Sequence, residues 1–207
     1  MAETRAKHAQ SESGSPQSAF ERLIAQAGSA KGRGPAPVHL WNPEYCGEMD
    51  MRIAADGTWF YMGTPIGRKP LVKLFSTVLR RDPERFVLVT PVERIGIEVE
   101  DAPFIAVEMA VKGKGQDQVI AFRTNVDDVV EADAEHPLRF EVEEGTGGLK
   151  PYVLVRGGLE ALVNRAVFYD LVALGVEEEH EGVRSFGVWS KGTFFAMAPA
   201  DEIAAYR

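Results

Sequence analysis

The sequence predicts an α+β fold built from two duplicated, β-rich halves. Short strand-like runs flank turn signals along most of the chain, and amphipathic helical patterns interrupt them in only a few places. The order of the elements is the third observation. Residues 50–99 and 137–198 both read as a hairpin, a glycine turn, a helix and a second hairpin, an order that indicates an internal repeat.

The first half begins with strands at 51–54 and 58–62 around Asp56-Gly57, a dipeptide typical of tight hairpins. A helix follows, because apolar residues recur with helical spacing over 71–79 and Pro70 suits its first turn. Strands at 86–90 and 95–99 complete this half. A further hairpin is predicted from strands at 104–111 and 119–124.

The second half pairs strands at 138–143 and 151–155 across a glycine-rich turn. A second helix is predicted from Leu159 to Leu174, ended by Gly175, and a last hairpin over 184–189 and 193–197. Residues 125–137 fit a strand or a loop. A shift of 91 residues superposes Tyr61 on Tyr152 and Gly67 on Gly158, and aligns the two predicted helices.

The N-terminal region has a different character. Residues 1–17 are polar, a capping box at Ser18 and Glu21 begins a short amphipathic helix at 18–27, and a Gly/Pro linker follows. We expect this helix either to pack on its own domain or to dock on a protein partner or a second protomer. We therefore divide the chain into a tail, helix and linker at 1–37, an N-terminal half at 38–112 and a C-terminal half at 113–207.

Charge and composition exclude several classes of protein. The net charge of −8 divides into +2 for residues 1–34 and −10 for the rest, a balance that disfavours nucleic-acid polymers and anionic membranes. No apolar run approaches a membrane span, and Cys46 is the one cysteine. With no secretory signal at the N-terminus, we expect a cytoplasmic protein without disulfides.

The motifs of common enzymes are missing. GTPIGRKP has three residues between its glycines, and Pro70 stands where a nucleotide-binding P-loop needs a hydroxyl. The sequence has no serine-hydrolase elbow and no His-Glu-x-x-His motif, and we expect neither a metal nor a cofactor. One enzymatic alternative stays open, in which His136 acts as a general base beside Glu131, Asp133 and Glu135.

The remaining candidates suit a small anion. Arg68 precedes the first predicted helix and Arg156 the second, where free backbone N–H groups favour negative charge. If the halves are related by a pseudo-twofold axis, both helix starts face one cleft. The predicted ligand-binding residues are Arg68, Arg123, Asn125, Arg156 and Arg165 for polar contacts, with Tyr61 and Tyr152 for stacking.

Four segments carry a family resemblance: CGEMDMRIAADGTWFYMGTPIGRKPLVKLF, VTPVERIGIEVEDAPF, FRTNVDDVVEADAEHPLRF and GGLEALVNRAVFYDLVALG. Together they resemble the uncharacterised bacterial domain-of-unknown-function family 1285 (DUF1285) over residues 40–198. The resemblance implies a duplicated α+β arrangement whose C-terminal half is similar to pleckstrin-homology folds. It also implies a nucleotide-like ligand between the halves and a role in signalling, and it supplies no catalytic residues.

The favoured interpretation is a cytoplasmic, non-enzymatic protein that binds a small anionic, nucleotide-like ligand between its halves. The alternatives are an enzyme that uses His136 and the nearby carboxylates, and an interaction module that docks through the helix at 18–27.

Overall fold

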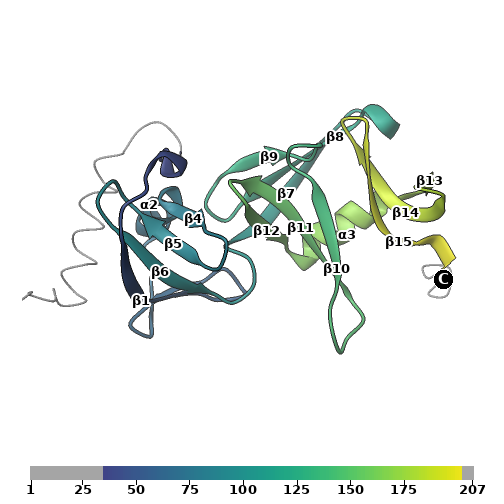
Figure 1. The fold of residues 1–207 in the computed structure, drawn as a ribbon. Helices are drawn as coiled ribbons and strands as arrows, with labels where there is room; N and C mark the ends of the chain where they lie inside the picture. The colour runs from purple at the N-terminus through teal and green to yellow at the C-terminus, as the bar shows by residue number, and fades with distance from the viewer. Residues whose placement is uncertain (1–34, 202–207) are drawn as a thin grey trace, which may run out of the picture.

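The computed structural model describes residues 35–201, so the helix predicted at 18–27 lies outside the described residues. Figure 1 shows three β-rich parts in a row. The N-terminal domain contains β1 to β6 with α2. The C-terminal domain contains a middle sheet of β7 to β12 and, at the far end, a smaller C-terminal sheet of β13 to β15. Across residues 35–201, no helix is long and apolar enough to cross a membrane.

The N-terminal sheet has six strands in the order β3-β2-β1-β6-β5-β4. Its strands are β1 (Tyr45–Ile53), β2 (Trp59–Tyr61), β3 (Thr64–Pro65), β4 (Leu79–Arg81), β5 (Phe86–Val89) and β6 (Arg94–Val99). β1 and β6 run parallel, and every other neighbouring pair is antiparallel. The sheet therefore consists of two three-stranded meanders joined by one parallel pair.

Helix α2 (Lys69–Thr77) connects the two meanders, as the sequence predicts. Arg68 occupies its N-cap and Pro70 lies in its first turn, where a missing N–H costs no helical hydrogen bond. Phe75 and Ser76 are buried, and the Phe75 ring stacks on Trp59 with 6.1 Å between the ring centroids. A short 3-10 turn, η1 (Val38–Leu40), precedes the sheet.

The middle sheet repeats this topology. Its strands are β7 (Phe104–Lys112), β8 (Val119–Thr124), β9 (Val129–Glu131), β10 (Leu138–Val142), β11 (Leu149–Arg156) and β12 (Leu159–Val163), with the short turn η2 (Gly115–Asp117) between β7 and β8. The order β10-β11-β12-β7-β8-β9 again joins two meanders through a parallel pair of the first and last strands, β7 and β12. Two curled six-stranded sheets with one strand order are consistent with the predicted duplication.

The repeat nevertheless has different bounds from those predicted. The second copy runs over 104–163, and residues 159–163 form strand β12, so the prediction of a helix from Leu159 is wrong. Leu159, Ala161 and Val163 are buried while the residues between them are half-buried, the alternation of a strand. The 91-residue shift therefore superposes the first part of helix α2 on strand β12 and its last part on the start of α3, so the aligned elements are not equivalent.

The second helix, α3 (Arg165–Ala173), begins one turn or more after the predicted start. Its N-cap is Asn164, whose side chain accepts a hydrogen bond from the Val167 amide at 2.9 Å. The segment YVLVRGGLEALV is consequently a β-hairpin, in which Gly157 and Gly158 form the turn with φ of +52° and +76°.

The C-terminal sheet consists of β13 (Val176–His180), β14 (Val183–Ser190) and β15 (Thr193–Pro199), paired antiparallel in that order. The hairpin predicted at 184–197 is confirmed, and the acidic edge strand β13 was not predicted. Buried Ser190 fastens this sheet to the middle sheet: its hydroxyl accepts from the Ile120 amide at 3.0 Å and donates to the Ala132 carbonyl at 2.6 Å.

The two domains part at residues 100–103, earlier than the expected boundary between 112 and 113, because β7 belongs wholly to the middle sheet. Neighbouring linker residues bind to opposite domains. The Glu100 carboxylate accepts from the Ala55 amide at 2.8 Å, whereas Asp101 accepts from the Tyr152 hydroxyl at 2.7 Å and pairs with Lys150 at 2.6 Å.

Candidate functional site

A cavity of about 540 Å³ lies where the two domains meet. Its N-terminal wall comes from the segment before β1, the last residue of α2 and strand β4. Its C-terminal wall comes from the end of β11, the turn that follows and the start of β12. The lining residues are Pro35, Ala36, Pro37, Val38, His39, Thr77, Leu79, Arg80, Arg81, Arg156, Gly157 and Leu159. We call this cavity the interdomain pocket.

Arg80 holds one wall of the interdomain pocket in place. Its guanidinium donates to the carbonyls of Val38 and Trp41 at 2.9 and 2.6 Å, which fixes the η1 turn over the pocket. The same side chain forms two bonds to the Asp82 carboxylate, at 2.7 and 3.3 Å. The charge and donors of Arg80 are therefore already engaged within the protein.

Arg156 links the two domains at the opposite wall. Its guanidinium donates to the Ser76 carbonyl of α2 at 2.8 Å, pairs with Asp128 at 3.3 Å and lies 4.8 Å from the centre of the Phe104 ring. Its Nε is buried and has no hydrogen-bond partner. Burial lowers the pKa of Arg156, and the charge of Asp128 offsets this only in part. An additional anion would favour the charged guanidinium.

Arg81 supplies a less engaged cation. Its guanidinium lies 4.3 Å from the centre of the Phe86 ring, and its stem lies against Gly158, where an added Cβ would come within 3.6 Å. Within the part of the chain that the structure describes, Arg81 forms no ion pair. The side chain is exposed, so its charge is available to a ligand at the pocket.

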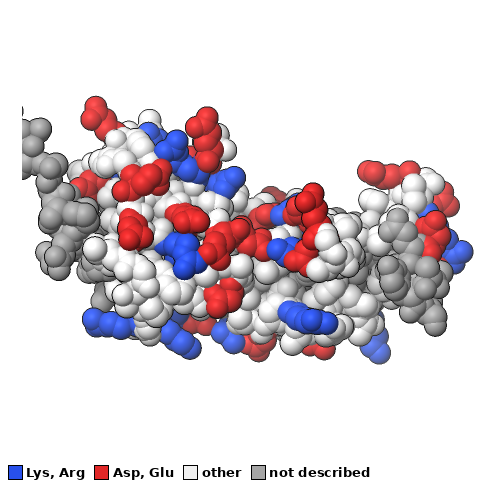
Figure 2. Space-filling view, turned by 90° about the horizontal axis from the view of Figure 1, so that it is seen from below, with Lys and Arg blue, Asp and Glu red and all other residues white. Residues whose placement is uncertain are grey.

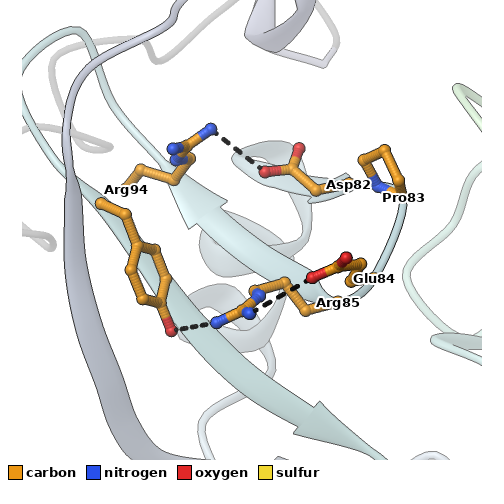
Figure 3. A pocket seen from close by; sticks show the side chains of 6 residues that line it. Asp82, Pro83, Glu84, Arg85 and Arg94 are labelled. Carbon is orange, nitrogen blue, oxygen red and sulfur yellow. Dashed lines mark hydrogen bonds and ion pairs between the residues drawn. The ribbon is translucent and has the colours of Figure 1, made fainter.

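A second pocket of about 350 Å³ lies within the N-terminal domain beside Tyr45. Figure 3 shows Arg94 directed at Asp82 and Arg85 directed at Glu84. The Arg85 guanidinium also donates to the Tyr45 hydroxyl at 2.8 Å. Two arginines and two carboxylates line this pocket, and each arginine is paired with a carboxylate. These charges compensate one another, so the second pocket offers less to an anion than the interdomain pocket.

The seven predicted ligand-binding residues do not converge on one pocket, and only Arg156 lines the interdomain pocket. Arg68 is exposed at the α2 N-cap. Residues 156–158 form a hairpin turn and not a helix start, so the expectation that Arg156 marks a helix N-terminus opposite Arg68 is wrong.

The other predicted cations and the amide have partners on the protein itself. Arg123 is exposed and bonds to Glu108 at 2.7 Å and to Asp127 at 2.8 Å. The Asn125 side chain accepts from the Ile105 amide at 3.1 Å. Arg165 is exposed on α3 and donates to the Tyr169 hydroxyl at 3.1 Å.

Neither predicted stacking residue presents a ring to the interdomain pocket. Tyr61 is half-buried in β2 and packs against the core. Tyr152 is buried in β11, with its hydroxyl on Asp101 and the Arg139 guanidinium 4.3 Å from its ring centre. Burial, followed by the hydrogen bond to Asp101, raises the pKa of Tyr152. Both tyrosine rings are therefore packed against other parts of the protein.

His136 lies in the turn before β10. Its Nδ1 is 3.2 Å from Asp133, and the same carboxylate oxygen accepts the backbone amides of Glu135 and His136. Asp133 and Glu131 both pair with Lys191, at 3.1 and 2.6 Å. His136 lines neither of the two pockets. Over residues 35–201, no group of three or more His, Cys, Asp or Glu side chains is placed to hold a metal ion.

Figure 2 shows acidic and basic side chains interspersed on one face of the molecule, without a single-sign field. Sequence reasoning missed Arg80, Arg81 and the pocket wall at 35–39. The available signal was the pair of arginines directly after the first predicted helix. A search guided by helix N-termini passes over that position, because the C-terminal end of a helix disfavours anions.

Comparison with known proteins identifies the two domains. The model of the DUF1285 N-terminal domain, a domain of unknown function, matches residues 36–102, and that of the DUF1285 C-terminal domain matches residues 103–197. No curated protein matches the sequence.

Two solved structures are similar. A DUF1285 family protein from Silicibacter pomeroyi DSS-3 is 51% identical with a TM-score of 0.82, over 88% of this chain and 97% of that one. One from Shewanella baltica OS155 is 24% identical with a TM-score of 0.48, over 60% and 91% of the two chains. The two family models together span nearly all of the described residues, and the chain therefore belongs to the DUF1285 family.

Proposed function

We propose that this protein binds a small anionic ligand in the interdomain pocket. The observation that carries the proposal is the charge of the lining: three arginines line the pocket, and none of the described residues lining it is an Asp or a Glu. An acidic protein that concentrates arginines in a concave site, with no carboxylate among the described side chains that line it, attracts small anions there and repels polyanions elsewhere.

The arginines have different roles in this proposal. Arg80 positions the wall at 38–41 through the Val38 and Trp41 carbonyls. Arg81 provides the uncompensated charge, because it lies on the Phe86 ring and forms no ion pair among the described residues. Arg156 adds a buried Nε that lacks an acceptor. A buried donor without a partner costs roughly 1–3 kcal/mol, which a ligand oxygen would recover.

A regulatory role follows from the position of the pocket. Arg156 lines it and also binds α2 of the opposite domain through the Ser76 carbonyl at 2.8 Å. A ligand that engages Arg156 would therefore change the strength of an interdomain contact, as a sensor requires. The signalling role and the pleckstrin-homology likeness that the family resemblance implies stay predictions.

Isothermal titration of the full-length protein tests the proposal. The probes are AMP, GMP, pyrophosphate and the straight-chain carboxylates from butanoate to decanoate, each up to millimolar concentration. We expect at least one of these anions to bind, and Arg81→Gln to weaken that binding by about tenfold or more, as for a charge-assisted contact.

Arg68→Gln is the matched control, because it removes an exposed arginine of the same domain that lies outside the pocket. Binding should survive this change. The proposal is overturned if no probe binds at millimolar concentration, or if Arg81→Gln and Arg68→Gln leave the affinity equally unchanged.

The interaction-module alternative depends on the helix predicted at 18–27 and stays a prediction. Removing residues 1–34 from the chain and comparing the oligomeric state by light scattering tests it: loss of a dimer or of partner capture with unchanged unfolding would support docking through this segment.

A further inference from the structure

We infer that the ligand of the interdomain pocket is an aliphatic acid, with an unbranched apolar body and a single acidic head group, rather than a nucleotide. This inference rests on the proposed function and names the class of anion that the pocket fits. It follows from the arrangement of apolar and charged side chains around the cavity.

Apolar groups form most of the pocket wall. Pro35, Ala36, Pro37 and Val38 supply one side, and Leu79 and Leu159 supply the floor, where both leucines are at least 98% buried. A ligand that fills a cavity of about 540 Å³ bounded in this way removes apolar surface from water, and burial of methylene groups gives affinity in proportion to chain length.

Base stacking would need a Phe, Tyr or Trp ring, which the described lining of this pocket does not supply. Bases are held by stacking on aromatic rings and by hydrogen bonds along their edges. No Phe, Tyr or Trp is among the described residues that line the cavity. The nearby Phe86 ring is covered by the Arg81 guanidinium, and Tyr152 is buried under Arg139.

The charge available to the ligand suits one acidic group. Arg80 is neutralised by Asp82, and Arg156 has Asp128 at 3.3 Å. Arg81 is therefore the one lining arginine whose charge has no carboxylate partner among residues 35–201. One uncompensated cation suits a single acidic group, whereas a di- or triphosphate would bring excess negative charge.

The affinities of butanoate, hexanoate, octanoate and decanoate, measured by isothermal titration below their micelle concentrations, test this inference. We expect affinity to rise about threefold to fourfold for each added methylene until the cavity is filled. AMP and GMP should bind no more tightly than pyrophosphate, because the base gains no partner.

Two variants separate the head-group contact from the chain contact. Arg81→Gln should lower the affinity of all four acids by a similar factor and leave the dependence on chain length intact. Val38→Thr preserves shape and adds a hydroxyl to the apolar wall, so it should flatten the dependence on chain length. Urea unfolding of each variant verifies that the fold is retained.

The outcomes distinguish the inference from the proposed function. If AMP or GMP binds more tightly than pyrophosphate and decanoate, or if affinity is independent of chain length, the aliphatic-acid assignment is overturned and anion binding stands. If neither the carboxylates nor the phosphates bind, both fail. Affinity that rises with chain length in the original protein but not in Val38→Thr supports the assignment.

Discussion

The guanidinium of Arg156 in the C-terminal domain donates a hydrogen bond to the backbone carbonyl of Ser76 in the N-terminal domain at 2.8 Å. Ser76 lies in the last turn of α2, where carbonyls lack the amide four residues on that donates to them within a helix. The Arg156 side chain thus donates to a carbonyl at the end of α2, pairs with Asp128 at 3.3 Å and lines the interdomain pocket. The domain contact and the interdomain pocket therefore share Arg156.

Replacing Arg156 by Met should destabilise the protein by about 1–3 kcal/mol, because the Ser76 carbonyl loses its donor and the Asp128 carboxylate loses its ion-pair partner at 3.3 Å. Urea unfolding followed by tryptophan fluorescence measures the effect. Arg68→Met is the control, with an expected change near zero at an exposed position. Identical midpoints for the two variants would show that the interdomain bond contributes nothing.

Ser190→Ala should also cost about 1–3 kcal/mol, although it removes only one oxygen atom. The Ile120 amide and the Ala132 carbonyl would lose their bonds of 3.0 and 2.6 Å, and Ser190 is fully buried, so water does not replace them. Ser185→Ala on the same strand is the control, because the buried Ser185 hydroxyl makes only a 3.4 Å bond to Val183. Equal losses from both variants would contradict this account.

Local signals in the sequence predict most of the fold. Asp56-Gly57 marks the β1–β2 hairpin correctly, since Gly57 takes φ of +82°, and the helical spacing over 71–79 finds α2 within two residues at either end. The prediction is wrong at residues 159–163, because this five-residue run is too short to distinguish the hydrophobic period of a helix from that of a strand. Its pairing with β7 is what makes it a strand. The parallel pairs β1–β6 and β7–β12 join distant segments, which no local pattern reveals.

The candidate site was harder to predict than the fold. Arg156 was chosen as a helix-start residue, and it reaches the pocket from a hairpin turn instead. The sequence shows the pair Arg80-Arg81, but it does not show that Arg80 is paired with Asp82 while Arg81 forms no ion pair among the described residues. That difference depends on which carboxylates lie near each side chain in space. Arg123 has the same chemistry, yet Glu108 and Asp127 neutralise it. Ion pairing is a property of tertiary structure, and a single sequence does not show it.

Asp133 should make the stability depend on pH in the acid range. Burial raises its pKa, but the amide of His136 and the Lys191 ammonium outweigh this and hold the value at about 2, below 3.8 in the unfolded chain. The ionised form therefore stabilises the fold above pH 4, and this contribution disappears as the pH falls from about 4 to 2.

The Asp133→Asn variant isolates that contribution. At pH 7 it should be less stable than the original protein by about 1–2 kcal/mol, and the difference should shrink at pH 3. Urea unfolding at pH 7, 5 and 3 measures it. Asp50→Asn, at an exposed position in β1, is the control for the Asp-to-Asn substitution itself. A stability difference that is constant with pH would contradict the assigned role of the carboxylate.

Gly187→Ala should be strongly destabilising, whereas Gly67→Ala should be tolerated. A Cβ at Gly187 would lie 2.3 Å from the Phe195 carbonyl oxygen and 2.7 Å from the Phe194 ring, so the paired strands β14 and β15 would have to separate. Overpacking of this kind costs typically about 1–3 kcal/mol or more.

Gly67→Ala is the control. At Gly67 an added Cβ meets nothing within 4 Å and φ is not positive. Because alanine also reduces the freedom of the unfolded chain, stability should be unchanged or raised by up to about 1 kcal/mol. Thermal and urea unfolding of the two variants measure the contrast, and comparable midpoints would mean that the β14–β15 hairpin repacks without cost.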